Sequence, residues 1–330
     1  MLKNWRIWLG LAISLLLLYL VVRNTDPAEL AAALAAANYA WLVPALAVYF
    51  VGVWLRAWRW RFLLRSIKPL PVGLLFRTII IGYMANNILP FRLGEIVRTY
   101  VLGVKGGVSK AATLTTIVVE RVMDGLTMVG FMVVASLLLP LDQTLQNTVR
   151  FSGLVFLAVV VVLFAIVASR RLADALVRVC LRPFPRAPAA KLEALAASFL
   201  NGLGALRSPR DLAGVLVFSV LGWLPESAMY ALIGAGFGLD QPFAVYILTT
   251  AAGNLGAMVP STPGYIGVFD APAKYVLVLS GVADGLATSF TLVLHAALLI
   301  PVILLGLVFL WQEGLSLQGL QRQQPRDADK

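Results

Sequence analysis

The chain has 330 residues, of which 60% are hydrophobic and only 13% are charged, and its mean hydropathy is +0.87. Soluble domains carry roughly twice that charged fraction, so the composition excludes a soluble globular protein and predicts an all-α polytopic membrane protein. The net charge of +11 does not indicate nucleic acid, because the basic residues cluster between apolar runs. One Cys and one His exclude a disulfide framework and a Cys/His metal cluster, so we expect neither metal nor cofactor.

Six apolar runs are long enough to cross the hydrocarbon core of a membrane as helices. They cover residues 5–22, 41–63, 112–139, 151–168, 211–236 and 286–311. Lys3 and Arg6 resemble the start of a signal peptide, but no cleavage-like small residues directly follow the apolar run, so we expect an uncleaved first span. Residues 26–38 predict a short amphipathic helix capped by Thr25 or Asp26.

Two further apolar segments, residues 72–103 and 243–280, are interrupted by stretches rich in Asn, Pro and Gly. Lipid tolerates such irregular backbone only where protein or a watery cavity shelters it. Interrupted segments at equivalent places in two halves of a membrane protein point to a transport site. We therefore predict two re-entrant broken-helix hairpins whose tips meet. Eight ordinary spans with two polar loops are the alternative.

The distribution of basic residues predicts the topology. If both hairpins return to the side from which they enter, nearly all of the 27 Lys and Arg residues lie on one side of the membrane. The positive-inside rule then places both termini in the cytoplasm, with the protein in the inner (plasma) membrane. Residues 1–140 and 151–311 each contain span, span, hairpin and span, in opposite orientations, which is an inverted repeat. The predicted domain is 1–311, followed by a polar tail over 312–330.

Charged residues after the first break are candidates for binding an anion. Arg92, Glu95 and Arg98 are spaced by three residues and share one helix face. The two guanidinium groups could clamp a phosphate while Glu95 orients one of them. A solvated loop with a salt bridge explains the same spacing.

The predicted span 112–139 carries Glu120, Arg121 and Asp124, and ionisable groups at such depth usually face a cavity or a partner. Glu120 and Asp124 are four residues apart, so two like charges on one face need a nearby cation or a bound proton. A purely structural ion pair is the alternative. The candidate cations are Arg92, Arg98 and Lys274.

The second half offers fewer charges. Glu226 follows Pro225 within a predicted span, where it either exchanges protons or satisfies backbone groups freed by a kink. The sequence over 260–265 predicts a compact turn whose hydroxyl and N–H groups could receive a head group. Asp270 and Lys274 are four residues apart, and we expect them to pair.

Two other features have a structural explanation that we prefer. The aromatic and basic residues at 56–61 are typical of a helix anchor at the cytoplasmic interface, with contact to anionic lipid as the alternative. His295 lies alone in an apolar run, where a packed, hydrogen-bonded histidine is more common than a proton relay.

Three separated motifs stand out along the chain. They are Asn86-Asn87-Ile88-Leu89-Pro90-Phe91-Arg92-Leu93-Gly94-Glu95-Ile96-Val97-Arg98, Val119-Glu120-Arg121-Val122-Met123-Asp124-Gly125 and Pro260-Ser261-Thr262-Pro263-Gly264-Tyr265-Ile266-Gly267. In this order they resemble one known family, the flippase-like transmembrane domain of lysylphosphatidylglycerol synthases. Trp41-Leu42 and the residues at 56–60 are similar to the family's early pattern, so the resemblance covers about 5–311.

The resemblance implies the lipid-translocating half of such synthases, without the soluble domain that makes the aminoacylated lipid. Stand-alone members could serve other lipids, including polyprenyl-phosphate-linked sugars or hopanoid-type lipids. We therefore expect a lipid flippase, not an enzyme, that moves an anionic or phosphate-bearing lipid between leaflets.

The alternative function is a membrane-embedded transferase, or its non-catalytic partner, with Glu120 and Asp124 holding a divalent cation. A purely structural or regulatory protein is a third possibility. The expected partner is the membrane lipid substrate, and no nucleic acid is expected. Whether the chain also binds a second copy of itself or a separate lipid-modifying enzyme is left open. The candidate substrate-binding residues are Asn86, Asn87, Pro90, Arg92, Glu95, Arg98, Glu120, Arg121, Asp124, Glu226, Asn254, Pro260, Ser261, Thr262 and Gly264.

Overall fold

The structure is a computed structural model, and the part of the chain that it describes is helical. The described residues are 16–19, 21, 23, 25–89, 93–139, 208–259 and 261–315, with isolated positions between 143 and 175. Helices and turns account for this part of the chain, and no strand occurs in it, which confirms the predicted all-α class. Most of the predicted spans 5–22 and 151–168 lies outside the described residues.

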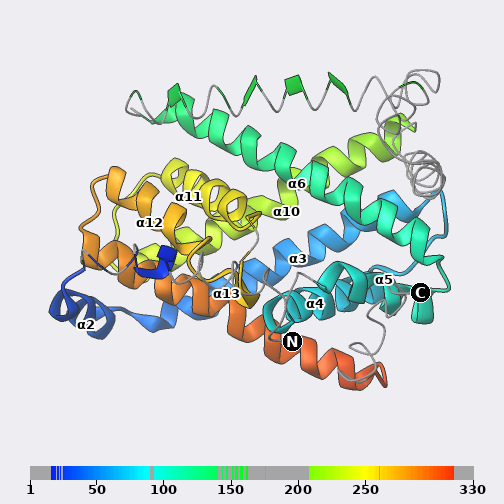
Figure 1. Ribbon diagram of the computed structural model, residues 1–330, viewed down its shortest axis with the longest axis horizontal. Helices are drawn as coiled ribbons and strands as arrows, with labels where there is room; N and C mark the ends of the chain where they lie inside the picture. Colours follow the sequence, from blue (N-terminus) through cyan, green and yellow to red (C-terminus); the bar gives the residue numbers. More distant parts are fainter. Residues whose placement is uncertain are drawn as a thin grey trace.

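The described helices follow one another in chain order (Figure 1), and most of residues 140–207 lie outside the described part of the chain. They are α2 (Pro27–Ala36), η1 (Tyr39–Trp41), α3 (Leu42–Leu64), α4 (Val72–Ile88), α5 (Gly94–Gly106), α6 (Lys110–Leu138), α10 (Pro209–Gly236), α11 (Phe243–Gly256), η4 (Pro263–Tyr265), α12 (Asp270–Leu279) and α13 (Asp284–Gln312). Among the described residues, three helical stretches are long and apolar enough to cross a membrane. They are Tyr39–Leu64, Pro209–Gly236 and Asp284–Gln312.

Helices α3 and α10 run antiparallel through the middle of the molecule (Figure 1). At one end of the pair Arg65 Nη1 lies 3.1 Å from Asp211 Oδ1, and at the other the Asn38 N–H donates to the Gly236 carbonyl at 2.8 Å. Gly52 lies between these ends, where an added Cβ would come within 3.1 Å of a carbonyl oxygen of α10. The small residue lets the two backbones approach closely, as small residues commonly do at helix contacts in membranes.

Both predicted breaks are present as two helices that fold back on each other: α4 on α5, and α11 on α12. In the first pair the Gly94 N–H donates to Asn86 Oδ1 at 2.7 Å, and a Cβ on Gly94 would collide with the Gly82 carbonyl. In the second pair a Cβ on Gly256 would collide with the Val268 carbonyl. Glycine at these points therefore sets how tightly each pair closes.

The two halves of the chain pack in the same pattern with their roles exchanged. Helix α4 of the first half lies on α13 of the second, and α11 of the second half lies on α6 of the first. In Figure 1 the α4–α5 pair lies to the right and the α11–α12 pair to the left of the central α3 and α10. This exchange is what an inverted repeat requires, and it brings the two broken segments to the same central region.

Two local predictions have different outcomes. The predicted 26–38 helix is α2, and the Asp26 side chain caps it by accepting from the Ala28 N–H at 2.8 Å. The predicted Asp270–Lys274 pair is wrong: Lys274 Nζ instead lies 2.8 Å from Asp284 Oδ2. Lys274 also donates to Thr25 Oγ1, so its charge joins α12 to the start of α13. Spacing of four along a helix permits a pair, but the closer contact came from a neighbouring helix.

Candidate functional site

A cavity of about 290 Å³ lies where the broken segments meet α3, α6, α10 and α13. Both polar and apolar side chains line it. The lining residues are Tyr49, Arg56, Tyr83, Asn86, Asn87, Glu95, Arg121, Asp124, Gly125, Met128, Trp223, Glu226, Asn254, Ala257, Met258, Gly264, Tyr265, Phe269, His295, Leu298, Leu299 and Val302. Ionisable side chains within membrane-spanning helices usually face such a space.

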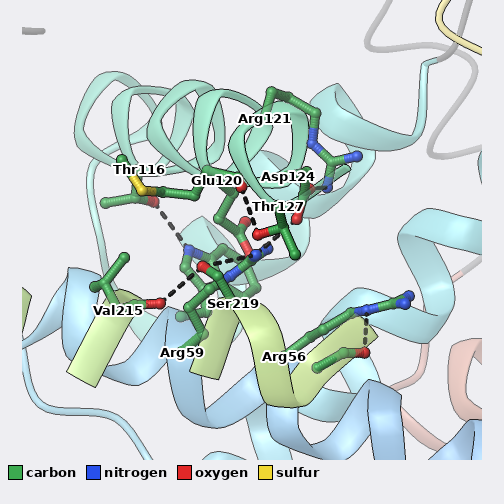
Figure 2. A network of polar contacts seen from close by, with 12 residues as sticks. Arg56, Arg59, Thr116, Glu120, Arg121, Asp124, Thr127, Val215 and Ser219 are labelled. Atoms are coloured by element: carbon green, nitrogen blue, oxygen red, sulfur yellow. Dashed lines mark hydrogen bonds and ion pairs between the residues drawn. The ribbon is translucent and has the colours of Figure 1, made fainter. Parts of the chain in front are cut away.

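A cluster of ion pairs, which we call the arginine cluster, contributes Arg121 and Asp124 to the lining of the cavity. Figure 2 shows these two side chains with Arg59 and Glu120. Arg59 of α3 places Nη1 2.6 Å from Asp124 Oδ1 and Nη2 3.4 Å from Glu120 Oε1. Arg98 of α5 lies 2.6 Å from the other Glu120 oxygen, and Arg121 lies 3.1 Å from Asp124 Oδ2. The cluster therefore consists of Arg59, Arg98, Arg121, Glu120 and Asp124, and it joins three helices.

The arginine cluster holds three positive and two negative charges. Arg59 and Arg98 are nearly completely buried, whereas 41% of the Arg121 side chain is exposed and lines the cavity. The Arg121 Nε–H has no hydrogen-bond acceptor among the described residues. Arg121 is therefore the guanidinium group of the cluster that a ligand in the cavity can reach, and Glu95, which also lines the cavity, balances the third positive charge.

A second ion pair connects the two central helices to the second broken segment. Arg56 Nη2 lies 2.6 Å from Glu226 Oε2. The other Glu226 oxygen accepts from Asn254 Nδ2 at 2.9 Å and from the Tyr230 hydroxyl at 3.3 Å. The Arg56 guanidinium also lies 3.8 Å from the centre of the Trp223 ring. Each charge thus has several partners, as buried ion pairs need in order to offset desolvation.

Glu95 contributes a carboxylate to the cavity from the first turn of α5. Asn86 Nδ2 donates to Glu95 Oε1 over 3.4 Å, and Asn87 lines the cavity beside it. The predicted neighbours Pro90 and Arg92 lie outside the described residues.

His295 of α13 faces the cavity and the proline-containing turn before α12. Its Nδ1 lies 2.6 Å from Asp270 Oδ1, and its Nε2 lies 2.6 Å from the carbonyl oxygen of Gly264. The second Asp270 oxygen accepts from the Gly267 N–H at 2.8 Å. The two side chains therefore hold the turn at both of its ends.

The structure distributes the candidate residues over three kinds of position. Those that line the cavity are Asn86, Asn87, Glu95, Arg121, Asp124, Glu226, Asn254 and Gly264. Arg98 and Glu120 lie behind its wall, paired with each other. Ser261 and Thr262 belong to the turn without lining the cavity. Pro90, Arg92 and Pro260 lie outside the described residues.

The pattern of residues at 56–61 predicts a membrane-interface anchor, and for Arg56 and Arg59 this prediction is wrong. Arg56 and Arg59 are 3% and 1% exposed and pair with carboxylates of other helices. Arg61, by contrast, lies 5.0 Å from the Trp58 ring, as an anchor would. The spacing held a signal, because residues three apart on a helix share a face. A second indication was that Glu120 and Glu226 have no basic residue three or four positions away on the same helix.

Lys274 was a predicted partner for the Glu120–Asp124 pair, and this too is wrong, since it contacts Asp284. Arg98 was predicted correctly as a partner of Glu120. Arg59 was the missed partner of both carboxylates. The other cavity residues missed from the candidate set include Tyr49, Tyr83, Trp223 and His295.

The fold and the cavity together define a helical membrane protein with a charged, amphipathic pocket between two broken helices. Residues 7–306 match the sequence model of the family described as lysylphosphatidylglycerol synthase TM region. The chain belongs to this family, as the three sequence motifs predicted. Comparison with curated proteins and with solved structures returned no match.

Proposed function

We propose that the protein is a flippase that moves an anionic or phosphate-bearing lipid between the leaflets of the cell's inner membrane, with both termini in the cytoplasm. The observation that carries the proposal is that polar and apolar side chains line the same cavity. Arg121, Asn87 and Asn254 offer polar groups to a head group, whereas Met128 and Leu298 offer an apolar surface to a hydrocarbon chain. A lipid crossing the membrane needs both environments at once.

Arg121 is the head-group contact in this proposal. It is cationic at all physiological pH values, and its planar fork matches phosphate oxygens. Arg59 and Arg98 both contact Glu120, and Arg59 also contacts Asp124, so Arg121 is not needed to neutralise Glu120 and its exposed guanidinium group can contact an anion. Aminoacylated phosphatidylglycerol and polyprenyl-phosphate-linked lipids both carry a phosphate, and in this proposal Arg121 contacts the phosphate that they share.

The transferase alternative needs Glu120 and Asp124 as free ligands of a divalent cation. Both carboxylates instead contact guanidinium groups: Glu120 contacts Arg98 and Arg59, and Asp124 contacts Arg59 and Arg121. A cation at this pair would have to displace these arginines from a buried site. We therefore favour transport over lipid-group transfer.

The test is transport by purified protein in liposomes that contain an acyl-labelled phospholipid. Loss of fluorescence on adding an impermeant reductant reports how fast the label reaches the outer leaflet. We expect Arg121→Ala to slow this rate roughly tenfold or more, because a hydrogen bond to a charged group is worth about 1.5–3 kcal/mol.

Arg65→Ala is the matched control, because Arg65 pairs with Asp211 at an exposed position away from the cavity. It should leave the rate unchanged. Equal rates in the parent, in both variants and in protein-free liposomes would refute the flippase proposal. Equal, protein-dependent rates in both variants would refute Arg121 as the head-group contact.

A further inference from the structure

The two hydrogen bonds of His295 constrain how many protons the site holds. The Gly264 carbonyl can only accept a hydrogen bond, so Nε2 of His295 must carry a hydrogen. Nδ1 faces the Asp270 carboxyl group at 2.6 Å, and a hydrogen must lie between these atoms as well. Either the ring is an imidazolium facing a carboxylate, or a neutral ring faces a protonated carboxyl group. Both arrangements contain the same shared proton.

Loss of that proton leaves one ring N–H for two acceptors. The Asp270 carboxylate is the stronger acceptor, because hydrogen bonds to charged groups are about twice as strong as neutral ones. The remaining hydrogen therefore moves to Nδ1, and the lone pair of Nε2 then faces the lone pairs of the Gly264 oxygen. This contact is repulsive, so the carbonyl separates from His295.

The turn that carries Gly264 is suited to move when this contact is lost. Gly264 has φ 76° and Tyr265 has φ 59°, and the left-handed region is unfavourable for a side chain such as that of tyrosine. Backbone strain of this kind costs about 1–3 kcal/mol and persists only where surrounding contacts impose it. His295 at Gly264 and Asp270 at Gly267 supply such contacts. Gly264 and Tyr265 also line the cavity, so their movement changes its shape.

Several other ionisable groups on the helices around the cavity are held in ion pairs. On α10, Glu226 is held by Arg56, and on α6, Asp124 is held by two arginines. On α12, Lys274 pairs with Asp284, and on α4, Arg77 pairs with Glu313 at the far end of α13. Among the described residues, other groups that face the cavity or α13 include Glu95, Arg121, Tyr49, Tyr83, Glu29 of α2 and Lys105, which pairs with Glu313.

We propose that Asp270 and His295 form a proton-binding site that couples the Pro263–Tyr265 turn to protons. When the pair is protonated the turn is held against α13; when the proton leaves to water in the cavity, the turn is released and the cavity opens. The proton site is independent of any cargo. The further step, that proton release at this site drives lipid movement, rests on the proposed flippase function.

The first test measures the position of the turn without any transport. Ser261→Cys is introduced into a Cys180→Ser background, and its reaction with a water-soluble maleimide is followed from about pH 5 to 10, a range that spans ordinary histidine titration. The same cysteine in a His295→Gln protein is the matched control. The thiol ionises with pH in both proteins, so the ratio of the two labelling rates cancels its contribution. Glutamine keeps an N–H donor for Gly264 that does not titrate.

We expect the ratio of the two rates to rise several-fold with pH as the turn is released. Asp270→Asn is the second variant, because its amide N–H can donate to Nδ1 of His295. The ring hydrogen then stays on Nε2 and donates to the Gly264 carbonyl, since no carboxylate competes for it. This variant should lose the pH response as well. A ratio that stays flat across the whole range, with both proteins folded, would overturn the proton site.

Transport measurements distinguish the proton-site proposal from the flippase proposal. A proton gradient should accelerate lipid movement by the parent protein and have no effect on His295→Gln. Labelling that titrates without lipid movement would support the proton site and count against the flippase. Lipid movement with flat labelling and no response to the gradient would support the flippase and overturn the proton coupling.

Discussion

At the scale of single residues, this protein keeps its charges in groups whose members come from different helices. Arg98 illustrates the point, since it neutralises Glu120 at 2.6 Å while its guanidinium lies 4.0 Å from the centre of the Trp60 ring. Both partners of the pair are almost completely buried. Removing one partner of such a pair leaves an uncompensated charge, which is far more costly than removing both.

This asymmetry gives a double-mutant prediction. Arg98→Leu should lower the free energy of unfolding by about 3–5 kcal/mol, because Glu120 keeps only its 3.4 Å contact with Arg59. Glu120→Leu combined with Arg98→Leu should recover much of that loss. Thermal unfolding of the purified variants in detergent measures both effects. Additive losses in the double variant would show that the two charges do not depend on each other.

At the scale of elements, the broken helices are shaped by glycine contacts. The α4–α5 pair closes where Gly82 and Gly94 face each other, and Asn86 ties the start of α5 to α4 by accepting from the Gly94 N–H and donating to Glu95. Apolar composition cannot hold two helices together in lipid, because the surroundings are equally apolar. Close backbone approach and internal hydrogen bonds take that role.

We therefore expect Gly94→Ala to destabilise the protein by about 1–3 kcal/mol, as overpacking does in tight interiors. The added methyl group would collide with Gly82 and Asn86. Gly130→Ala in α6 is the control, because nothing lies within 4 Å of its added Cβ, and alanine there should be neutral or stabilising. Unfolding temperatures that fall equally in both variants would contradict the packing account.

At the scale of the whole molecule, the central antiparallel pair α3–α10 brings the two halves together. Each half then supplies a broken helix to the other half's last described helix, and the cavity forms between them. The arrangement makes the site a property of both halves, since Arg121 comes from the first and Asn254 from the second.

Cross-linking tests the antiparallel register directly. Cysteines in place of Arg65 and Asp211, whose side chains are 3.1 Å apart, should be joined by a short bifunctional maleimide in a Cys180→Ser background. Arg65→Cys with Gly236→Cys is the control, because Gly236 lies at the opposite end of α10. Efficient linking of the control pair instead would indicate parallel helices.

The sequence by itself determined the membrane class, the family and the two broken segments, because composition, motifs and breaks in apolar runs are read along the chain. It also indicated that Glu120, Asp124 and Glu226 need partners, since a charge within a membrane helix is costly wherever the helix lies. These properties depend on each segment alone.

Which partner each charge takes was decided only by the tertiary structure. Arg56 and Arg59 read as interface anchors, Lys274 as a partner of Asp270, and His295 as a packed residue. Their contacts with Glu226, Asp124, Asp284 and Asp270 depend on how helices far apart in sequence cross each other. A periodicity shows which residues share a face of one helix, but not which other helix that face meets, and the cavity exists only where such faces converge.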